Sequence, residues 1–203
     1  MNNHWSDQIL NSFQTLSKLD NNYKYIISKY GLPNCRKEEN NFKSLMKIII
    51  GQQISRKAAD SIFERLLKNK ISTHIKFLKY DDLFLKNFGL SFRKIQYLKN
   101  LAKKIDQNEI NLIEFENSSS EFVYNSLIKI KGIGKWTINN YQLFVLEDCD
   151  AWPGGDLAIQ EAIKKLNKLD RRPTENDVNI LAKKWMPFRG SAALLLWHYY
   201  SKQ

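Results

Sequence analysis

The sequence predicts an all-α fold, and three observations support this expectation. Apolar residues recur at helical spacing in most segments, and no pair of alternating runs indicates neighbouring strands. Serine or threonine, which cap helices well, stands before several of these segments. Glycine or proline marks the breaks between them. Because no low-complexity linker or repeat divides residues 1–203, we expect a single domain in which short connections join the helices.

The first strongly apolar segment, "FKSLMKIIIGQQ", is expected to form a buried helix. Ser55 and Ser91 are placed to cap two amphipathic segments that follow it, and Thr174 is placed to cap a later one. The segments expected to be helical are, in order, 42–53, 56–69, 92–105 after Gly89, 121–130 after three serines, 135–147, 157–169, 175–185 and, beyond Pro187, 189–200.

The composition narrows the function. Lys and Arg total 32 against 21 Asp and Glu, a formal net charge of +11, which points to a polyanionic partner such as nucleic acid. Codon bias in an A·T-rich genome would give the same excess, so charge alone leaves both explanations open. No apolar run is long enough to span a membrane, and the N-terminus lacks a signal-peptide pattern. Cys35 and Cys149 are too few for a four-cysteine cluster or zinc site, and they fit a reducing cytosol.

The segment "LIKIKGIGKWT" (127–137) predicts a helix, a tight turn and a second helix. Gly132 and Gly134 allow positive φ angles and the close approach of another surface. The first amides of the second helix lack intrahelical partners and suit a phosphate, to which Lys135 and Thr137 add a cation and a hydroxyl. An ordinary helix–helix turn is the alternative. The flanking apolar residues, spaced to lock two helices together, favour the binding role.

This segment resembles the helix-hairpin-helix of the base-excision DNA glycosylase superfamily, specifically its 3-methyladenine DNA glycosylase II branch. Four other segments resemble motifs of that branch in the same order: "IIIGQQISRKAA" (48–59), "GLSFRKIQYL" (89–98), "DAWPGGDLAIQ" (150–160) and "KWMPFRGSAALLLW" (184–197). The resemblance implies one glycosylase domain with two helical lobes flanking a cleft for DNA and base. Lobe A is expected at about 41–148 and lobe B at about 1–40 plus 149–203.

The resemblance implies that Asp156 is the catalytic residue. Hydrolysis of an N-glycosidic bond passes through a sugar with oxocarbenium character, which a nearby carboxylate stabilises, and the same carboxylate helps to orient water. Taken alone, Asp156 is also well placed as an ordinary N-cap of the segment that follows. The two roles are compatible, because capping would hold the carboxylate still and ionised.

Trp136 stands where the bifunctional branch of the superfamily has a nucleophilic lysine. A tryptophan cannot form a Schiff base, and Lys135 points about 100° away on a helix. The resemblance therefore implies a monofunctional enzyme that releases the base without lyase activity. Trp136 instead offers a ring face to a positively charged alkylated purine, a contact of roughly 0.5–2 kcal/mol. A core position beside the hairpin is the alternative role for Trp136.

Other site residues follow from the same resemblance. Tyr141 fits the core better than a pocket, and Asn140 stands where a relative has a pocket tyrosine, so lesion preference cannot be copied across. Gln53 matches the wedge that fills the gap left by a flipped base, with an ordinary polar helix end as the alternative. The candidate base-pocket residues are Trp136, Trp197, Trp152 and Tyr141; the candidate DNA contacts are Gly132, Gly134, Lys135, Thr137, Lys94 and Arg189.

The implied protein releases alkylated purines such as 3-methyladenine from double-stranded DNA in base excision repair. The resemblance implies a monomer that needs no metal, iron–sulfur cluster or other cofactor and no membrane. Its expected location is the cytoplasm of a bacterium or its nucleoid. A non-catalytic helix-hairpin-helix DNA-binding protein, in which Asp156 is only a cap, is the alternative.

Overall fold

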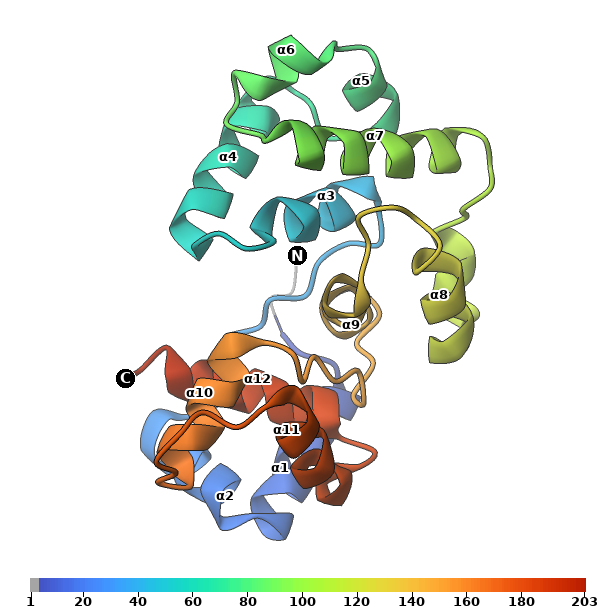
Figure 1. Cartoon of the computed structure of the whole chain (residues 1–203). Coiled ribbons are helices and arrows are strands. Elements are labelled where there is room, and N and C mark those ends of the chain that lie inside the picture. Colours follow the sequence, from blue (N-terminus) through green and yellow to red (C-terminus); the bar gives the residue numbers. More distant parts are fainter. Residues whose placement is uncertain (1–3) are drawn as a thin grey trace. The chain divides into compact units, whose positions relative to one another are not determined.

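The computed structural model describes residues 4–203, so residues 1–3 of the expected lobe B lie outside the described part. The described chain is helical and holds no β-strand, which confirms the all-α prediction. It divides into two compact units (Figure 1). We call Glu38–Tyr141 the central unit, and we call the N-terminal segment up to Lys37 together with Gln142–Gln203 the terminal unit.

The central unit packs around α7 (Phe92–Asp106), which contacts α3, α5 and α6, while α3 also contacts α4 (Figure 1). The buried side chains of α7 recur every three or four residues, so one apolar stripe faces these neighbours. The other helices of this unit are α3 (Phe42–Gly51), α4 (Arg56–Lys68), α5 (His74–Leu78), α6 (Asp82–Lys86), η1 (Ile113–Asn117), α8 (Ser120–Leu127) and most of α9 (Lys135–Phe144).

The terminal unit packs around α12 (Arg189–Tyr200), which contacts α1, α2 and α10. Every residue from Gly190 to Leu196 is buried, as expected of a helix that is apolar on all sides. A Cβ at Gly190 would lie 2.8 Å from the carbonyl oxygens of Asp148 and Cys149, so only glycine allows this approach. The other helices of this unit are α1 (Asp7–Leu19), α2 (Asn21–Tyr30), α10 (Leu157–Leu166), α11 (Glu175–Ala182) and η2 (Lys183–Trp185).

The helix starts predicted from the sequence are confirmed. The side chains of Ser55, Ser91 and Thr174 each accept a hydrogen bond from the backbone amide three residues on. Thr174 also forms a capping box, because the Asp177 carboxylate accepts the Thr174 amide. The segments expected to be helical did not include α1 and α2, which precede residue 42. They also did not include α5 and α6, whose five residues each are too few to show a helical period.

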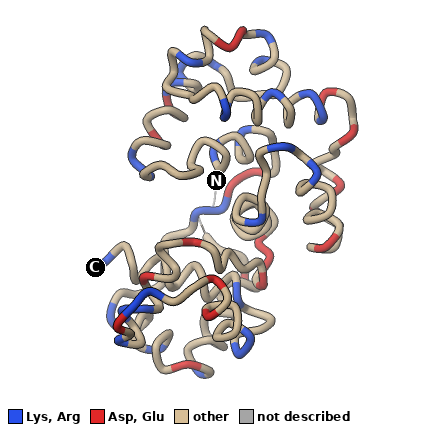
Figure 2. Tube along the Cα trace, in the orientation of Figure 1, with Lys and Arg blue, Asp and Glu red and all other residues tan. Residues whose placement is uncertain are grey.

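The described chain has no helix long and apolar enough to cross a membrane. Figure 2 shows Lys and Arg spread over the elements of both units and interleaved with Asp and Glu. The net charge of +11 is therefore a property of the whole chain rather than of one element. The distribution of charge therefore does not identify a functional surface.

Candidate functional site

The hairpin between α8 and α9 is built from buried apolar anchors and one strained turn. Leu127, Ile130 and Ile133 are buried, as the sequence predicted for residues that lock two helices together. Gly132 has φ +95°, and a Cβ there would lie 2.0 Å from the ring of Tyr97. Gly134 differs, because its Cβ position is open and its φ is not positive. The fold therefore requires glycine at position 132, whereas it leaves open space beside Gly134.

Thr137 lies inside the central unit rather than on its surface. Only 2% of Thr137 is exposed, and its hydroxyl oxygen accepts a hydrogen bond from Nε2 of Gln52 at 2.9 Å. We therefore remove Thr137 from the expected phosphate contacts, because its side chain is already enclosed. Lys135 and Gly134 of the same turn are exposed.

Lys94 also has an internal partner. Its ammonium donates to the carbonyl of Ile50 at 2.6 Å, and this carbonyl lies in the last turn of α3, where helix carbonyls lack partners. Burial lowers the pKa of Lys94. Lys94 therefore fixes the end of α3, and its contact with DNA stays a prediction. The next loop residue, Gln53, is exposed and has φ +55°, so it stands out at the apex of this loop.

In the terminal unit, Asp156 begins α10. Its Oδ1 accepts the backbone amides of Ala158 at 2.9 Å and Ile159 at 3.2 Å, which confirms its predicted role as an N-cap. A Cβ at Gly154 would lie 2.3 Å from Oδ1 of Asn179, so a larger residue would require the Asn179 side chain to move.

Trp197 is joined to the same carboxylate. Its indole Nε1 donates to Oδ1 of Asp156 at 3.0 Å. One neighbour of its ring is Phe144, stacked at 5.6 Å between centroids and 22° between planes. The guanidinium of Arg36 lies 4.8 Å from the Phe144 ring centroid and 5.9 Å from that of Trp197. The sequence had singled out neither Phe144 nor Arg36, because their distance in sequence from Trp197 hides the contact.

Arg189 pairs with an acid of its own unit. Its guanidinium makes two hydrogen bonds to Asp150, at 2.9 and 2.6 Å, and its backbone amide makes a third at 3.1 Å. These bonds to Asp150 raise the pKa of Arg189. Arg189 therefore ties the start of α12 to the loop that leads to Asp156, and its contact with DNA stays a prediction.

The remaining candidate aromatic residues are divided between the two units. Trp136 is half-buried in the central unit, and its carbonyl accepts the Asn140 side chain at 2.7 Å. Trp152 is half-buried in the terminal unit, where its indole donates to Asn179 at 2.9 Å. Tyr141 is fully buried and donates to Asn40 at 2.5 Å, and burial raises its pKa. We therefore remove Tyr141 from the expected base pocket and place it in the core.

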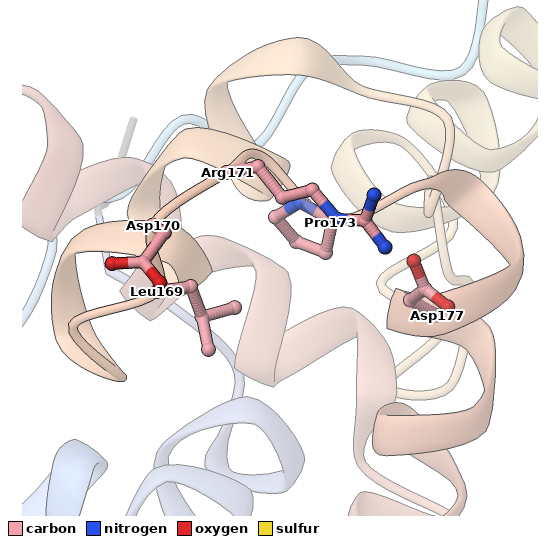
Figure 3. A pocket seen from close by; sticks show the side chains of 5 residues that line it. All are labelled: Leu169, Asp170, Arg171, Pro173 and Asp177. Atoms are coloured by element: carbon pink, nitrogen blue, oxygen red, sulfur yellow. The ribbon is translucent and has the colours of Figure 1, made fainter.

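A surface hollow of about 400 Å³ lies beyond the far end of α10 from Asp156 (Figure 3). Leu169, Asp170, Arg171, Pro173 and Asp177 line it, and none of them was a candidate site residue. Among residues 4–203, no three His, Cys, Asp or Glu side chains are grouped so as to hold a metal ion.

Residues 46–188 match the family model described as the HhH-GPD superfamily base excision DNA repair protein. DNA-3-methyladenine glycosylase 1 of Schizosaccharomyces pombe is 32% identical over 192 residues, which cover 90% of this chain and 83% of that protein. A solved structure of the 3-methyladenine DNA glycosylase of the same yeast, in complex with abasic DNA, has a TM-score of 0.82 at 31% identity and covers 92% of this chain and 95% of that one. The Bacillus subtilis protein YfjP is 30% identical over 183 residues, and the chain spans 60% of its length.

Proposed function

Because this chain belongs to the HhH-GPD superfamily of base excision DNA repair proteins, we propose that it is a monofunctional DNA glycosylase. It flips alkylated purines, such as 3-methyladenine, out of duplex DNA and hydrolyses their N-glycosidic bond. The observation that carries the proposal is the carboxylate of Asp156, whose Oδ1 accepts three N–H groups at the start of α10. The likeness to relatives named for 3-methyladenine supports the substrate class.

Asp156 supplies the negative charge that the reaction needs. As the bond between sugar and base breaks, positive charge develops on the sugar, and a carboxylate beside it lowers the energy of that state. The two backbone amides and the indole fix the orientation of the carboxylate, so little reorganisation is needed when the charge develops. The same carboxylate orients the water that attacks the sugar.

The absence of lyase chemistry rests on Trp136. A bifunctional enzyme attacks the sugar with an amine, and the indole at position 136 offers none. The neighbouring Lys135 begins α9, and the next position of a helix points about 100° away from it. The product is therefore an intact abasic site.

The hairpin anchors the DNA backbone. The open space beside Gly134 lets a phosphate approach the first amides of α9, and the exposed Lys135 adds a positive charge. Gln53, exposed at the apex of its loop, fills the space that a flipped base leaves in the duplex. Gly132 supports this contact indirectly, by allowing the turn itself.

The proposed base contacts are tryptophan rings: Trp197 and Trp152 in the terminal unit and Trp136 in the central unit. A positively charged alkylated purine over such a ring gains roughly 0.5–2 kcal/mol. Trp197 has the additional role of holding Asp156. The enzyme acts as a monomer on damaged double-stranded DNA and uses no cofactor.

A panel of duplexes, each with one defined lesion, tests this function. The protein is incubated with each duplex, and the free base is separated and measured directly. We expect release of 3-methyladenine and other alkylated purines, and none of normal bases. Tight duplex binding without release of any base from the panel would overturn the glycosylase proposal.

A further inference from the structure

We propose that Gln52 is a positioning residue that holds the hairpin turn in the shape in which it contacts DNA phosphates. This inference rests on the proposed function, of which it requires only the contact between the hairpin and DNA phosphates. Gln52 lies at the end of α3, 80 residues before Gly132 and 85 before Thr137 in the sequence. Within the hairpin, the Ile133 amide donates to the carbonyl of Ile130 at 3.0 Å, and Gln52 adds a side-chain link from outside the hairpin.

The Gln52 side chain joins both sides of the turn through one nitrogen. Its Nε2 donates to the carbonyl of Gly132 and to the hydroxyl oxygen of Thr137, each at 2.9 Å. A carbonyl oxygen only accepts hydrogen bonds, so the nitrogen rather than the oxygen of the amide must face Gly132. Both N–H groups of the amide are therefore used, one before the turn and one after it.

Gln52 is itself held firmly. Its backbone amide donates to the carbonyl of Ile49 at 3.3 Å, and Lys94 of α7 donates to the neighbouring carbonyl of Ile50 at 2.6 Å. The same α7 places Tyr97 directly against Gly132. The turn is thus supported by two elements, α3 through the Gln52 amide and α7 through the Tyr97 ring.

The residues proposed to contact DNA have little support of their own. Gly134 has no atom within 4 Å of its Cβ position, and Lys135 is exposed. Thr137, by contrast, is 2% exposed, so losing its bond to Gln52 leaves a buried polar group with one partner fewer. The shape of the exposed part of the turn therefore depends on the half-buried Gln52 amide behind it.

The test is a neutral substitution, Gln52→Met, which keeps the length of the side chain and removes both donors. Gln96→Met is the matched control, because Gln96 is exposed on α7 of the same unit and its amide donates to Asp82 at 2.6 Å, away from the hairpin. Affinity for an undamaged duplex is measured against salt concentration. We expect Gln52→Met to bind about tenfold more weakly, with a salt slope smaller by about one phosphate contact, and Gln96→Met to match wild type.

Thr137 provides a second pair of variants. Thr137→Val keeps the shape and loses the acceptor, whereas Thr137→Ser keeps the hydroxyl. Thr137→Val should bind DNA more weakly than wild type, and Thr137→Ser should bind like wild type. This pair tests the role of the hydrogen bond even if Gln52→Met does not fold. Wild-type affinity and salt slope in folded Gln52→Met, or equal binding by the two Thr137 variants, would overturn the proposal.

The readouts also separate this inference from the glycosylase function. Binding to undamaged DNA requires no base release, so the salt slope tests Gln52 even if the wild-type protein excises nothing. If base release is present, Gln52→Met should need more enzyme for half-maximal release, in proportion to its weaker binding. A fall in the rate of release with unchanged affinity would contradict a role in anchoring.

Discussion

The indole nitrogen of Trp197 lies 3.0 Å from Oδ1 of Asp156, the same oxygen that caps α10. The two residues are 41 positions apart and meet because α12 and α10 pack against each other in the terminal unit. A residue that ordinarily only starts a helix thus receives a third donor from a side chain. The capping interpretation and the catalytic interpretation of Asp156 describe one carboxylate, fixed in place by the fold and available for chemistry.

Trp197→Phe should slow base release by about 10- to 100-fold, the cost of one hydrogen bond to a charged group. Phenylalanine keeps most of the stacking on Phe144 and removes the donor to Asp156. Single-turnover kinetics with a lesion-containing duplex measure the rate. Trp185→Phe is the control, since the indole of Trp185 donates to Asp20 instead and its loss should lower stability without slowing excision. Equal excision rates in wild type and Trp197→Phe would remove Trp197 from the site.

The two glycines of the hairpin should respond differently to alanine. Gly132→Ala forces a side chain into φ +95° and against the Tyr97 ring, so it should destabilise the protein by at least about 2 kcal/mol. Gly134→Ala should change the free energy of unfolding by less than about 1 kcal/mol, because its Cβ position is open. It should nevertheless weaken binding to damaged and undamaged duplexes alike, since phosphate contacts do not discriminate between bases. Denaturant unfolding and duplex titration give the two quantities, and unchanged affinity in Gly134→Ala would show that the hairpin is not the anchor.

Acid should weaken one ion pair of the terminal unit. Burial raises the pKa of Glu147, but hydrogen bonds from Lys37 and from the Ser6 amide outweigh burial and lower it. Because the pKa of Glu147 is lower in the folded than in the unfolded protein, its charged form stabilises the fold. This stabilisation is present above the unfolded pKa of about 4.3 and is lost as the pH falls through the folded pKa. Glu147→Gln should therefore cost roughly 1.5–3 kcal/mol at pH 7, and the difference from wild type should shrink below about pH 4. A constant difference between pH 7 and pH 3 in urea unfolding would rule out this linkage.

Borohydride trapping tests the assignment of hydrolysis without lyase activity. The reagent freezes only an imine between enzyme and sugar, and Trp136 has no amine to form one. Wild-type protein with a lesion-containing duplex should give no trapped complex, and strand breaks should appear only after alkali is added. Efficient trapping would mean that Lys135 or another amine reaches the sugar.

The sequence predicted the features that depend on neighbouring residues and missed those that depend on distant ones. Helix starts at Ser55 and Ser91 involve a bond to an amide three residues on, so the pattern alone is sufficient. Thr137 was expected to contact DNA from its place at the start of a helix, and Lys94 and Arg189 were expected to do so from the resemblance. Each has an internal partner at a separation of 39 to 85 residues, which no local pattern reveals.

Gln52 is a residue whose role depends on distant contacts and which the sequence did not single out. The sequence drew attention to its neighbour Gln53, because the resemblance places the wedge there, and gave Gln52 no role. Only the fold shows that the Gln52 amide lies against Gly132 and Thr137. The segment that holds Gln52 and the hairpin segment were recognised as separate motifs. In the fold, the Gln52 side chain joins them at one turn.

The most direct test of the central claim is base release by Asp156→Asn on DNA carrying one defined alkylated purine. Asparagine keeps an oxygen that can cap α10 and accept the Trp197 indole, so the fold and duplex binding should persist. The neutral amide cannot stabilise an oxocarbenium ion, so we expect free base to fall to the background of the untreated duplex while affinity stays at the wild-type value. Excision by Asp156→Asn at close to the wild-type rate would contradict the assignment of Asp156 as the catalytic residue.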